Sequence, residues 1–354
     1  MGVKTLIAKR ILLTIPVIIG VVTIIFATLS VMSPGMRIAY FTGNTPRNYA
    51  RQEMDTLIHE YGLDQPIWIQ YANWLRQIIT LDFGRSMSSH APAINMVFAS
   101  LPTTLELLLY SVPFIVFLSI WLGTKAAINH NKPVDHAARI IGVLGTSAPV
   151  FITASVLILI TLIVQNPYAF RLDPYLQLCY QRGIDLTLRV RNGTFIQYTN
   201  MISIDALLNG DIVLFEDSLE HLALPVITLV FTQCAALIRI TRSGLIEELG
   251  KPYIFSALSK GLSRKEAAYK HARRNASISV LTILGVLFSN MFISIVIVEA
   301  VFGRPGFALL LATSARTMDT PVLFACITIV TLFLVFVNVI VDILYMHVDP
   351  RIRL

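Results

Sequence analysis

The stretch Ile278–Val298 reads ISVLTILGVLFSNMFISIVIV and carries no charged residue. Of its 21 residues, 14 are Leu, Ile, Val or Phe. A helix that crosses a bilayer needs about 20 apolar residues. Each Leu, Ile, Val or Phe near the bilayer centre favours insertion by about 0.3–0.6 kcal/mol, on the order of 6 kcal/mol for the whole stretch. The stretch therefore predicts a transmembrane helix.

Five further apolar runs have or approach the same length. They are Ile11–Met32, Leu101–Thr124, Ile140–Val164, Leu222–Ile238 and Val322–Val341. Only the second run contains a charge, Glu106. The whole chain is 55% hydrophobic and 14% charged, whereas soluble domains have about 25% charged residues. The fold class predicted is an all-α polytopic membrane protein with six transmembrane helices, two sizeable external loops and a cytoplasmic coupling helix.

The distribution of positive charge predicts the orientation of these helices. The first run is longer than the apolar core of a signal peptide, so it is expected to be retained as a span. An even number of spans places both termini on one side. Most of the 28 Lys and Arg residues lie in the termini and in the loops that share their side. By the positive-inside rule that side is the cytoplasm. The excess of basic residues therefore reflects membrane topology, and no nucleic-acid partner is predicted.

The order of runs and loops predicts the domain organisation. It is an N-terminal transmembrane helix at 1–32, an external cap region at 33–100, a large transmembrane domain at 101–346 and a cytoplasmic tail at 347–354. The large domain contains an external insertion at 166–221 and a coupling region at 250–275.

Shorter patterns predict local structure in the two external regions. In the cap region, Arg51–Glu60 and Gln65–Ile79 have helical periodicity. In the insertion, the alternation in Asp185–Val190 and Thr194–Tyr198 predicts short strands.

The segment 250–275 predicts two short helices at the cytoplasmic surface. Pro252 suits the first position of a helix, and Gly261 suits its C-terminal cap. Ser263 and Glu266 have the spacing of a capping box that starts a second helix.

The two helices would form a protruding knuckle with features of a docking surface. Ala257 and Gly261 leave one helix face with little side chain, and Tyr253 and Phe255 offer aromatic anchors. Such a surface suits a protein partner. The alternative is an ordinary solvated basic loop.

No motif for catalysis, nucleotide binding or metal binding occurs in the sequence. There is no Walker A loop, no His-Glu-x-x-His, no nucleophile elbow and no dinucleotide fingerprint. The seven histidines are scattered. No catalytic or metal site is therefore predicted, and uphill transport would draw on an ion gradient or on another subunit.

Three acidic residues lie at the ends of predicted spans, namely Glu106, Glu299 and Asp342. None lies at mid-bilayer, where a charge costs roughly 3 kcal/mol or more. Two interpretations remain open for them: local pairing at the membrane interface, or a role in the pore or its gate. Their position argues against a proton or sodium relay within this chain.

The sequence resembles the permease subunits of type I ABC importers, specifically the oligopeptide/dipeptide/nickel permease family. The knuckle carries the first part of the resemblance, through Ser256–Leu262, His271 and Arg274–Ala276. The rest follows in order along nearly the whole chain: Arg10, Ile15-Pro16, Pro34-Gly35, Tyr61–Pro66, Gln70-Tyr71, Trp74-Leu75, Asp82–Ser86, Leu101–Glu106, Glu299, Val301-Phe302, Pro305-Gly306, Asp319, Pro321-Val322, Asn338, Asp342, Tyr345 and Asp349–Arg353. The sequence departs from the family pattern at Met36, Leu258 and Ser279 and in a longer second external loop.

The resemblance implies a pore-forming subunit in the cell membrane that imports ligand, with peptide as the leading class and oligosaccharide or a nickel complex still open. It implies four protein partners: a second permease, two ATPase subunits and an extracytoplasmic binding protein. ATP and Mg²⁺ would be bound by the ATPases, with no cofactor on this chain. The coupling residues expected are Tyr253, Ala257, Gly261, Leu262 and Glu266. The alternatives are a self-contained secondary transporter or channel, and a membrane-bound enzyme or receptor.

Overall fold

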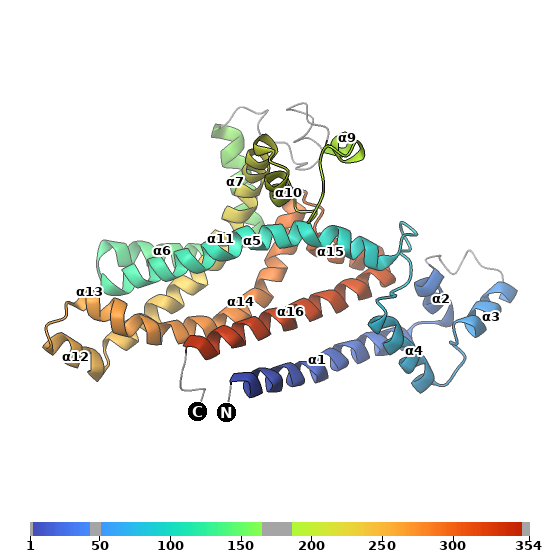
Figure 1. Cartoon of the computed structure of the whole chain (residues 1–354), viewed down its shortest axis with the longest axis horizontal. Helices are drawn as coiled ribbons and strands as arrows, with labels where there is room; N and C mark the ends of the chain where they lie inside the picture. Colours follow the sequence, from blue (N-terminus) through green and yellow to red (C-terminus); the bar gives the residue numbers. More distant parts are fainter. Residues whose placement is uncertain (1–2, 43–50, 165–185, 349–354) are drawn as a thin grey trace. The chain divides into compact units, whose positions relative to one another are not determined.

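The computed structural model describes residues 3–42, 51–164 and 186–348 (Figure 1). These residues divide into two compact units. Unit 1 contains Thr103–Arg304 with Met1–Thr5 and Val337–Leu354, and unit 2 contains Leu6–Pro102 with Pro305–Phe336.

The described part of the chain is almost entirely helical. Its only β-type pairing is an isolated bridge between Arg85 and Pro92. The helices are α1 (Val3–Val31), α2 (Pro34–Thr42), α3 (Arg51–Glu60), α4 (Ile67–Ile79), α5 (Ala93–Ile128), α6 (Pro133–Ser147), α7 (Val150–Val164), α9 (Leu186–Arg191), α10 (Ile202–Leu208), α11 (Ile212–Leu249), α12 (Pro252–Ser259), α13 (Arg264–Ala267), a π-helical turn (Ala268–Ala272), α14 (Arg273–Val301), α15 (Phe307–Thr317) and α16 (Thr320–Val348).

Four of the described helices are long and apolar enough to cross a membrane. The candidate spans are Leu12–Val31, Ala93–Ile128, Ile212–Leu249 and Thr320–Val341. The bent pair α6–α7 is a fifth candidate span if its two helices are counted together. The run Ile278–Val298 lies in α14, of which Gly285–Val301 forms a shorter apolar helix. A polytopic helical membrane protein is thus confirmed, at four to five candidate spans.

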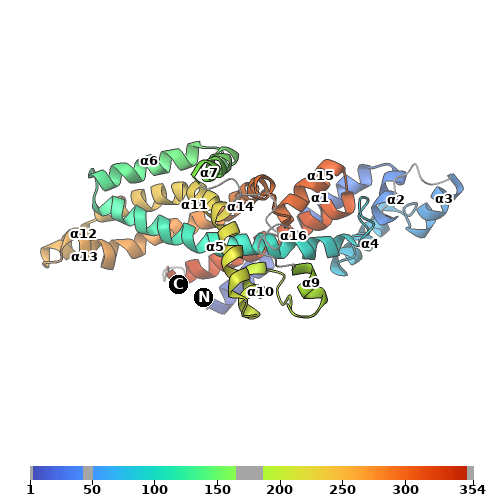
Figure 2. The same cartoon turned by 90° about the horizontal axis from the view of Figure 1, so that it is seen from above.

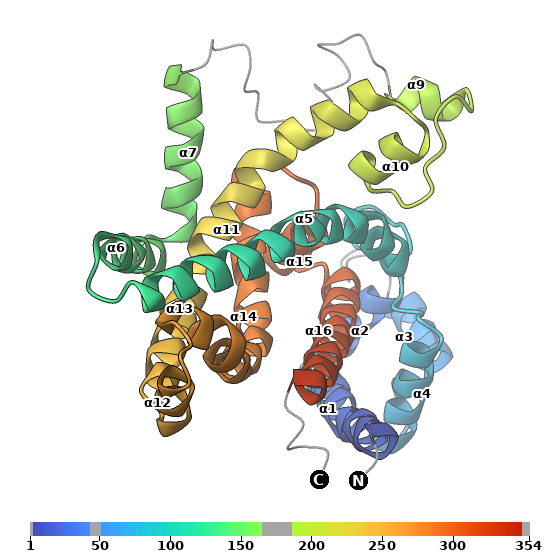
Figure 3. The ribbon, with the colours of Figure 1, turned by 60° about the vertical axis from the view of Figure 1, so that its left-hand side comes forward.

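The predicted continuous helix over Ile140–Val164 is wrong. The chain breaks there into α6 and α7, which meet at 109°, and Figure 3 shows α7 leaving α6 steeply. Ala148 adopts an extended backbone (φ −79°, ψ 121°) directly before Pro149. Proline disfavours helical conformation at the residue before it and has no N–H for the helical ladder. A purely apolar run does not reveal this bend.

In unit 1, α11 is the central helix and packs on α6, α7, α10 and α14, with α6 running beside it in Figure 2. Gly145 of α6 makes a close approach possible. A Cβ atom added to Gly145 would lie 2.6 Å from the Cβ of Ala235 and 2.8 Å from the carbonyl oxygen of Phe231. Small residues at such crossings let helix backbones pack tightly inside membranes.

In unit 2, the core lies between α1, α4 and the start of α16. Its largest side chains are Phe26, Tyr40, Trp74 and Phe324. A polar contact also joins two segments far apart in sequence. Asp319 accepts hydrogen bonds from the hydroxyl of Ser86 (2.5 Å) and from the hydroxyl and backbone N–H of Ser88.

The helices predicted over Arg51–Glu60 and Gln65–Ile79 are present as α3 and α4. The strands predicted in the insertion are absent from its described part. Leu186–Arg191 is helical, and Thr194–Tyr198 is irregular. Asn209 explains the second case: its side chain accepts from the N–H of Ile196 (3.0 Å) and donates to the carbonyl oxygen of Ile196 (2.8 Å). These backbone groups are thereby satisfied without a strand partner.

The close crossing of α6 and α11 leads to a prediction about stability. Gly145→Ala is expected to lower the free energy of unfolding by about 1–3 kcal/mol, because the added methyl group overpacks the helix contact. Thermal unfolding of the purified protein in detergent measures the change. Gly20→Ala in α1 is the control, since nothing lies within 4 Å of a Cβ atom at Gly20. Equal melting temperatures for the two variants would contradict the tight crossing.

Candidate functional site

The two short helices predicted for the knuckle are present as α12 and α13. Pro252 is the first residue of α12. Gly261 follows the helix with a left-handed backbone (φ +91°), and its N–H donates to the carbonyl oxygen of Leu258 at 2.9 Å. Ser263 and Glu266 form both hydrogen bonds of the predicted capping box. Local sequence rules thus define where both helices begin.

One face of α12 is attached to the rest of unit 1. Ile254 is buried in an apolar cluster with Leu245 and Leu249 of α11. The remaining members come from α5, from α13, from the π-helical turn and from the start of α14, and are Ala127, Ala267, Ala268, Ala272 and Ala276. Ala257 of α12 is also buried, with 9% of its surface exposed.

The opposite face of α12 is open. Phe255 is 58% exposed, and Ser256, Ser259 and Lys260 are also exposed. Figures 1 to 3 all show α12 and α13 together at one end of unit 1, beside the start of α14. A free aromatic side chain on a firmly attached helix is a surface suited to protein contact.

A polar cluster that sequence reasoning missed ties α12 to its neighbours. We call it the Tyr253 clamp, and it consists of Glu248, Lys251, Tyr253 and Asn275. The hydroxyl of Tyr253 donates to Oε2 of Glu248 (2.5 Å) and accepts from Nδ2 of Asn275 (3.1 Å). Lys251 pairs with the other carboxylate oxygen of Glu248. The clamp joins the end of α11, the start of α12 and the start of α14.

The protonation states suit this clamp. Burial raises the pKa of the Tyr253 hydroxyl, and the bond to Glu248 raises it further. The same carboxylate raises the pKa of Lys251. Tyr253 therefore keeps the proton that it donates at neutral pH. Glu266 has a different role: hydrogen bonds from the backbone and hydroxyl of Ser263 lower its pKa, which holds it as the charged helix cap.

A second charged group links α11 to α6. Asp135 is fully buried and accepts from Nη2 of Arg242 (2.9 Å) and from Nη2 of Arg139 (2.7 Å). The N–H of Asn131 completes the set at 2.9 Å. From the sequence, Asp135, Arg139 and Arg242 were interpreted only as charges that indicate the orientation of the spans. Their pairing fastens the first turns of α6 to α11, one to two turns from the apolar cluster of the knuckle.

Two of the predicted pore or gate residues lie in a buried polar cluster elsewhere in unit 1. Glu106 pairs with Nη2 of Arg304 (2.9 Å) and accepts from the N–H and hydroxyl of Ser203 (2.8 and 2.6 Å). Glu299 accepts from the hydroxyl of Thr104. The cluster connects α5, α10 and the end of α14. Local pairing is therefore present, and a gating role stays a prediction.

No role was predicted for Arg304 from the sequence. The only signal for such a role was the presence of a basic residue between Gly303 and Pro305. Asp342 lies in α16, but its side chain is outside the described part of the chain. Leu262, the last coupling candidate, is half-buried directly after Gly261.

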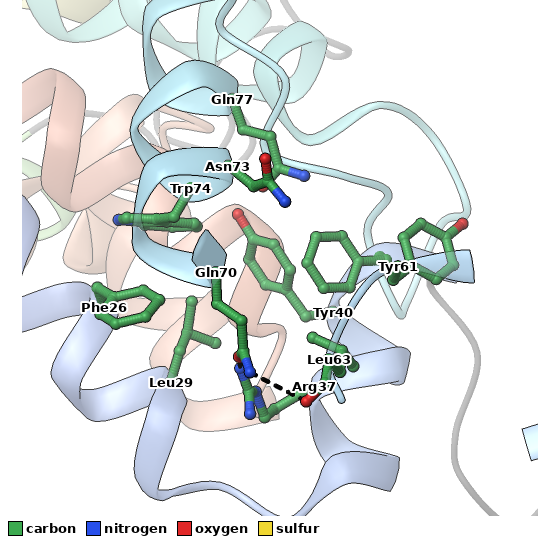
Figure 4. A pocket seen from close by; sticks show the side chains of 11 residues that line it. Phe26, Leu29, Arg37, Tyr40, Tyr61, Leu63, Gln70, Asn73, Trp74 and Gln77 are labelled. Atoms are coloured by element: carbon green, nitrogen blue, oxygen red, sulfur yellow. Dashed lines mark hydrogen bonds between the residues drawn. The ribbon is translucent and has the colours of Figure 1, made fainter. Parts of the chain in front are cut away.

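Small cavities are found in each unit. The larger is in unit 2 and has about 40 Å³, room for two or three waters. Figure 4 shows α2 and α4 facing each other across it, with Arg37 donating to Gln70 and the Tyr40 ring between them. Neither cavity could hold a peptide. No group of His, Cys, Asp and Glu among the residues described could hold a metal ion.

Comparison with known proteins identifies the family. Residues 115–354 match the family described as the inner membrane component of binding-protein-dependent transport systems, and residues 3–119 match its N-terminal family. The chain belongs to this permease family. It is 31% identical over 353 residues to the dipeptide transport system permease protein DppB of Escherichia coli K12, covering 98% of each chain. It is also 31% identical over 349 residues to the di/tripeptide permease DppB of Pseudomonas aeruginosa, and 30% identical over 348 residues to the oligopeptide permease AppB of Bacillus subtilis, again covering 98% of each chain.

Membership in this permease family confirms the resemblance noted in the sequence. A self-contained secondary transporter is not favoured for a chain with these relatives.

The buried pair in the permease leads to a second stability prediction. Arg304→Ala is expected to lower the free energy of unfolding by about 3–5 kcal/mol, because it leaves the Glu106 carboxylate buried without its counter-ion. The double variant Glu106→Gln/Arg304→Met should recover much of this loss, since no buried charge remains. Thermal unfolding in detergent provides the measurement.

A partly exposed pair offers the matched control. Arg189 pairs with Asp211, with 41% and 18% of the two side chains exposed. Arg189→Ala is expected to cost about 0–1 kcal/mol, because solvent screens such pairs. An Arg304→Ala variant as stable as Arg189→Ala would refute the structural role of the buried pair.

Proposed function

We propose that this chain is one of two pore-forming permease subunits of an ATP-driven peptide importer. Several findings support the proposal: the family, the named relatives that transport dipeptides or oligopeptides, and the lack of a nucleotide-binding motif in the sequence. ATP and Mg²⁺ would be bound by two separate ATPase subunits. A binding protein on the outer side of the membrane would deliver the peptide, and the second permease would complete the pore.

In this proposal α12 is the element on which an ATPase acts. The observation that carries it is the contrast between the two faces of α12: Ile254 and Ala257 are buried on one, and Phe255 is exposed on the other. Force applied to an exposed side chain reaches the spans only if the helix beneath it is attached to them. The apolar cluster and the Tyr253 clamp provide that attachment to α11 and α14.

The five coupling candidates then divide into two roles. Ala257 is buried on the inner face of α12, Tyr253 ties α12 to Glu248, and Glu266 caps α13. These three would transmit movement within this chain. Gly261 and Leu262 lie at the turn between α12 and α13, where Gly261 has open space around it. These two would lie nearest the ATPase.

Both termini and α12 are placed in the cytoplasm in this proposal, in line with the concentration of Lys and Arg on that side. ATP-driven closure of the ATPases would draw α12 inward and turn α11 and α14 with it. Such coupling requires contacts that differ between the two states of the pore.

Gly261→Trp tests the docking role of the knuckle. It is expected to reduce peptide-stimulated ATP hydrolysis by roughly tenfold or more, because a bulky side chain at a docking turn costs about 2 kcal/mol or more of interface energy. The measurement uses the assembled transporter in liposomes with binding protein and peptide. Membrane insertion of the variant should be normal.

The chain offers a closely matched control in Gly193→Trp. Gly193 also has a left-handed backbone (φ +69°) and open space around it, but it lies in the external insertion. Backbone strain is therefore similar in the two variants, and only the proposed ATPase contact differs. Equal stimulation in both variants would show that the knuckle does not receive the ATPase.

Tyr253→Phe tests the clamp. Loss of the hydroxyl removes one hydrogen bond to a carboxylate and one from an amide, about 2–4 kcal/mol together. A looser α12 is expected to lower peptide-stimulated ATP hydrolysis several-fold with the ATPases still bound. Tyr198→Phe, at an exposed external position, is the control. Full stimulation in Tyr253→Phe would mean that the apolar cluster alone attaches α12.

A further inference from the structure

Helix α4 packs against the middle of the membrane span in α1. The indole N–H of Trp74 donates to the carbonyl oxygen of Val22 at 3.4 Å. The hydroxyl of Tyr71 lies 2.8 Å from the hydroxyl oxygen of Thr23, and its ring meets Phe26 edge-on at 5.1 Å. One face of α4 is therefore in contact with one side of α1 between Val22 and Phe26.

This contact determines the depth of α4 relative to the bilayer. The span of α1 is Leu12–Val31, 20 residues or about 30 Å of helix, and Val22 lies near its midpoint. A second span gives an independent measure. Trp74 also packs against Phe324 at 6.5 Å between ring centroids, and Phe324 is inside the span Thr320–Val341. The inner face of α4 thus lies beside the middle of one span and beside the first turns of another.

The outer face of α4 exposes apolar side chains, whereas a helix face in contact with water usually carries polar residues. Trp68 is 71% exposed and Ile79 is 81% exposed. They are eleven residues apart, close to three helical turns, so they share one face. Ala72 and Arg76 are exposed on the same face. Trp is typical of the zone between acyl chains and headgroups, and a long basic side chain can reach from there to phosphate.

We propose that α4 is an interfacial helix embedded in the leaflet that holds the Val31 end of α1. Trp68 and Ile79 contact lipid acyl chains, and Arg76 extends to the lipid phosphates. Lipid is the occupant favoured because the contacts with Val22 and Phe324 leave α4 too deep to face water. In addition, α1 itself exposes Ile24 and Val31 within its span. The proposal places α4, a helix of the external cap region predicted at 33–100, in lipid.

Spin-label accessibility tests this placement in the assembled transporter, reconstituted in phosphatidylcholine nanodiscs. Nitroxide labels are attached at Trp68→Cys and, in a separate variant, at Ile79→Cys. Collision rates are measured with oxygen, which concentrates in lipid, and with a water-soluble nickel chelate. Ile24→Cys is the lipid reference and Gln197→Cys, in the irregular segment of the external insertion, is the aqueous reference, both being exposed in the structure. All variants carry Cys179→Ser, and this background without an introduced cysteine measures residual labelling, since Cys234 and Cys326 are buried.

Oxygen collisions at both α4 positions are expected to exceed nickel collisions several-fold, as at Ile24. A nickel-dominated signal would overturn the proposal, because α4 would then face water. Low collision rates with both reagents would also overturn it, by showing that the second permease or the binding protein covers this face. Two labelling positions keep the test decisive if one variant fails to assemble. The readout does not involve ATP hydrolysis, so the placement of α4 is tested independently of the proposed function.

Discussion

A charge that a membrane protein buries away from water needs its partner within the chain, and this constraint determines which segments of the permease must meet. Glu106 has Arg304 and Ser203, and Asp135 has Arg242. Leaving any of these groups without a partner would cost several kcal/mol. Each pair joins segments that are far apart in sequence. The charged pairs therefore act as fixed points around which the apolar helices pack.

Helix α11 connects most of these fixed points in unit 1. Its 38 residues extend about 57 Å. Its beginning packs on α10, which carries Ser203 of the Glu106 cluster. Its second half holds Arg242, and its last turn supplies Glu248 to the Tyr253 clamp. In the proposed coupling, a shift of α12 would be passed to a helix whose other end packs on α10, which carries Ser203. The single long helix gives the proposed coupling a physical route.

Features that depend on neighbouring residues could be predicted from the sequence. The start of α12 at Pro252, the turn at Gly261 and the capping box of Ser263 and Glu266 all follow from backbone preferences and hydrogen bonds within a few residues. The strands expected in the insertion failed for the opposite reason. There the backbone of Ile196 is satisfied by the side chain of Asn209, 13 residues away, and no periodicity reports such a contact.

By itself, the sequence determined that this protein is a helical membrane permease, because the length of an apolar run and the order of family motifs are properties of the linear chain. Only the tertiary structure decided that Tyr253 bonds Glu248 and Asn275, that Arg304 neutralises Glu106, and that α4 packs on α1. These pairings join residues between 5 and nearly 200 positions apart. Their formation depends on how whole helices pack, and a pattern of single residues does not encode which distant helix will face them.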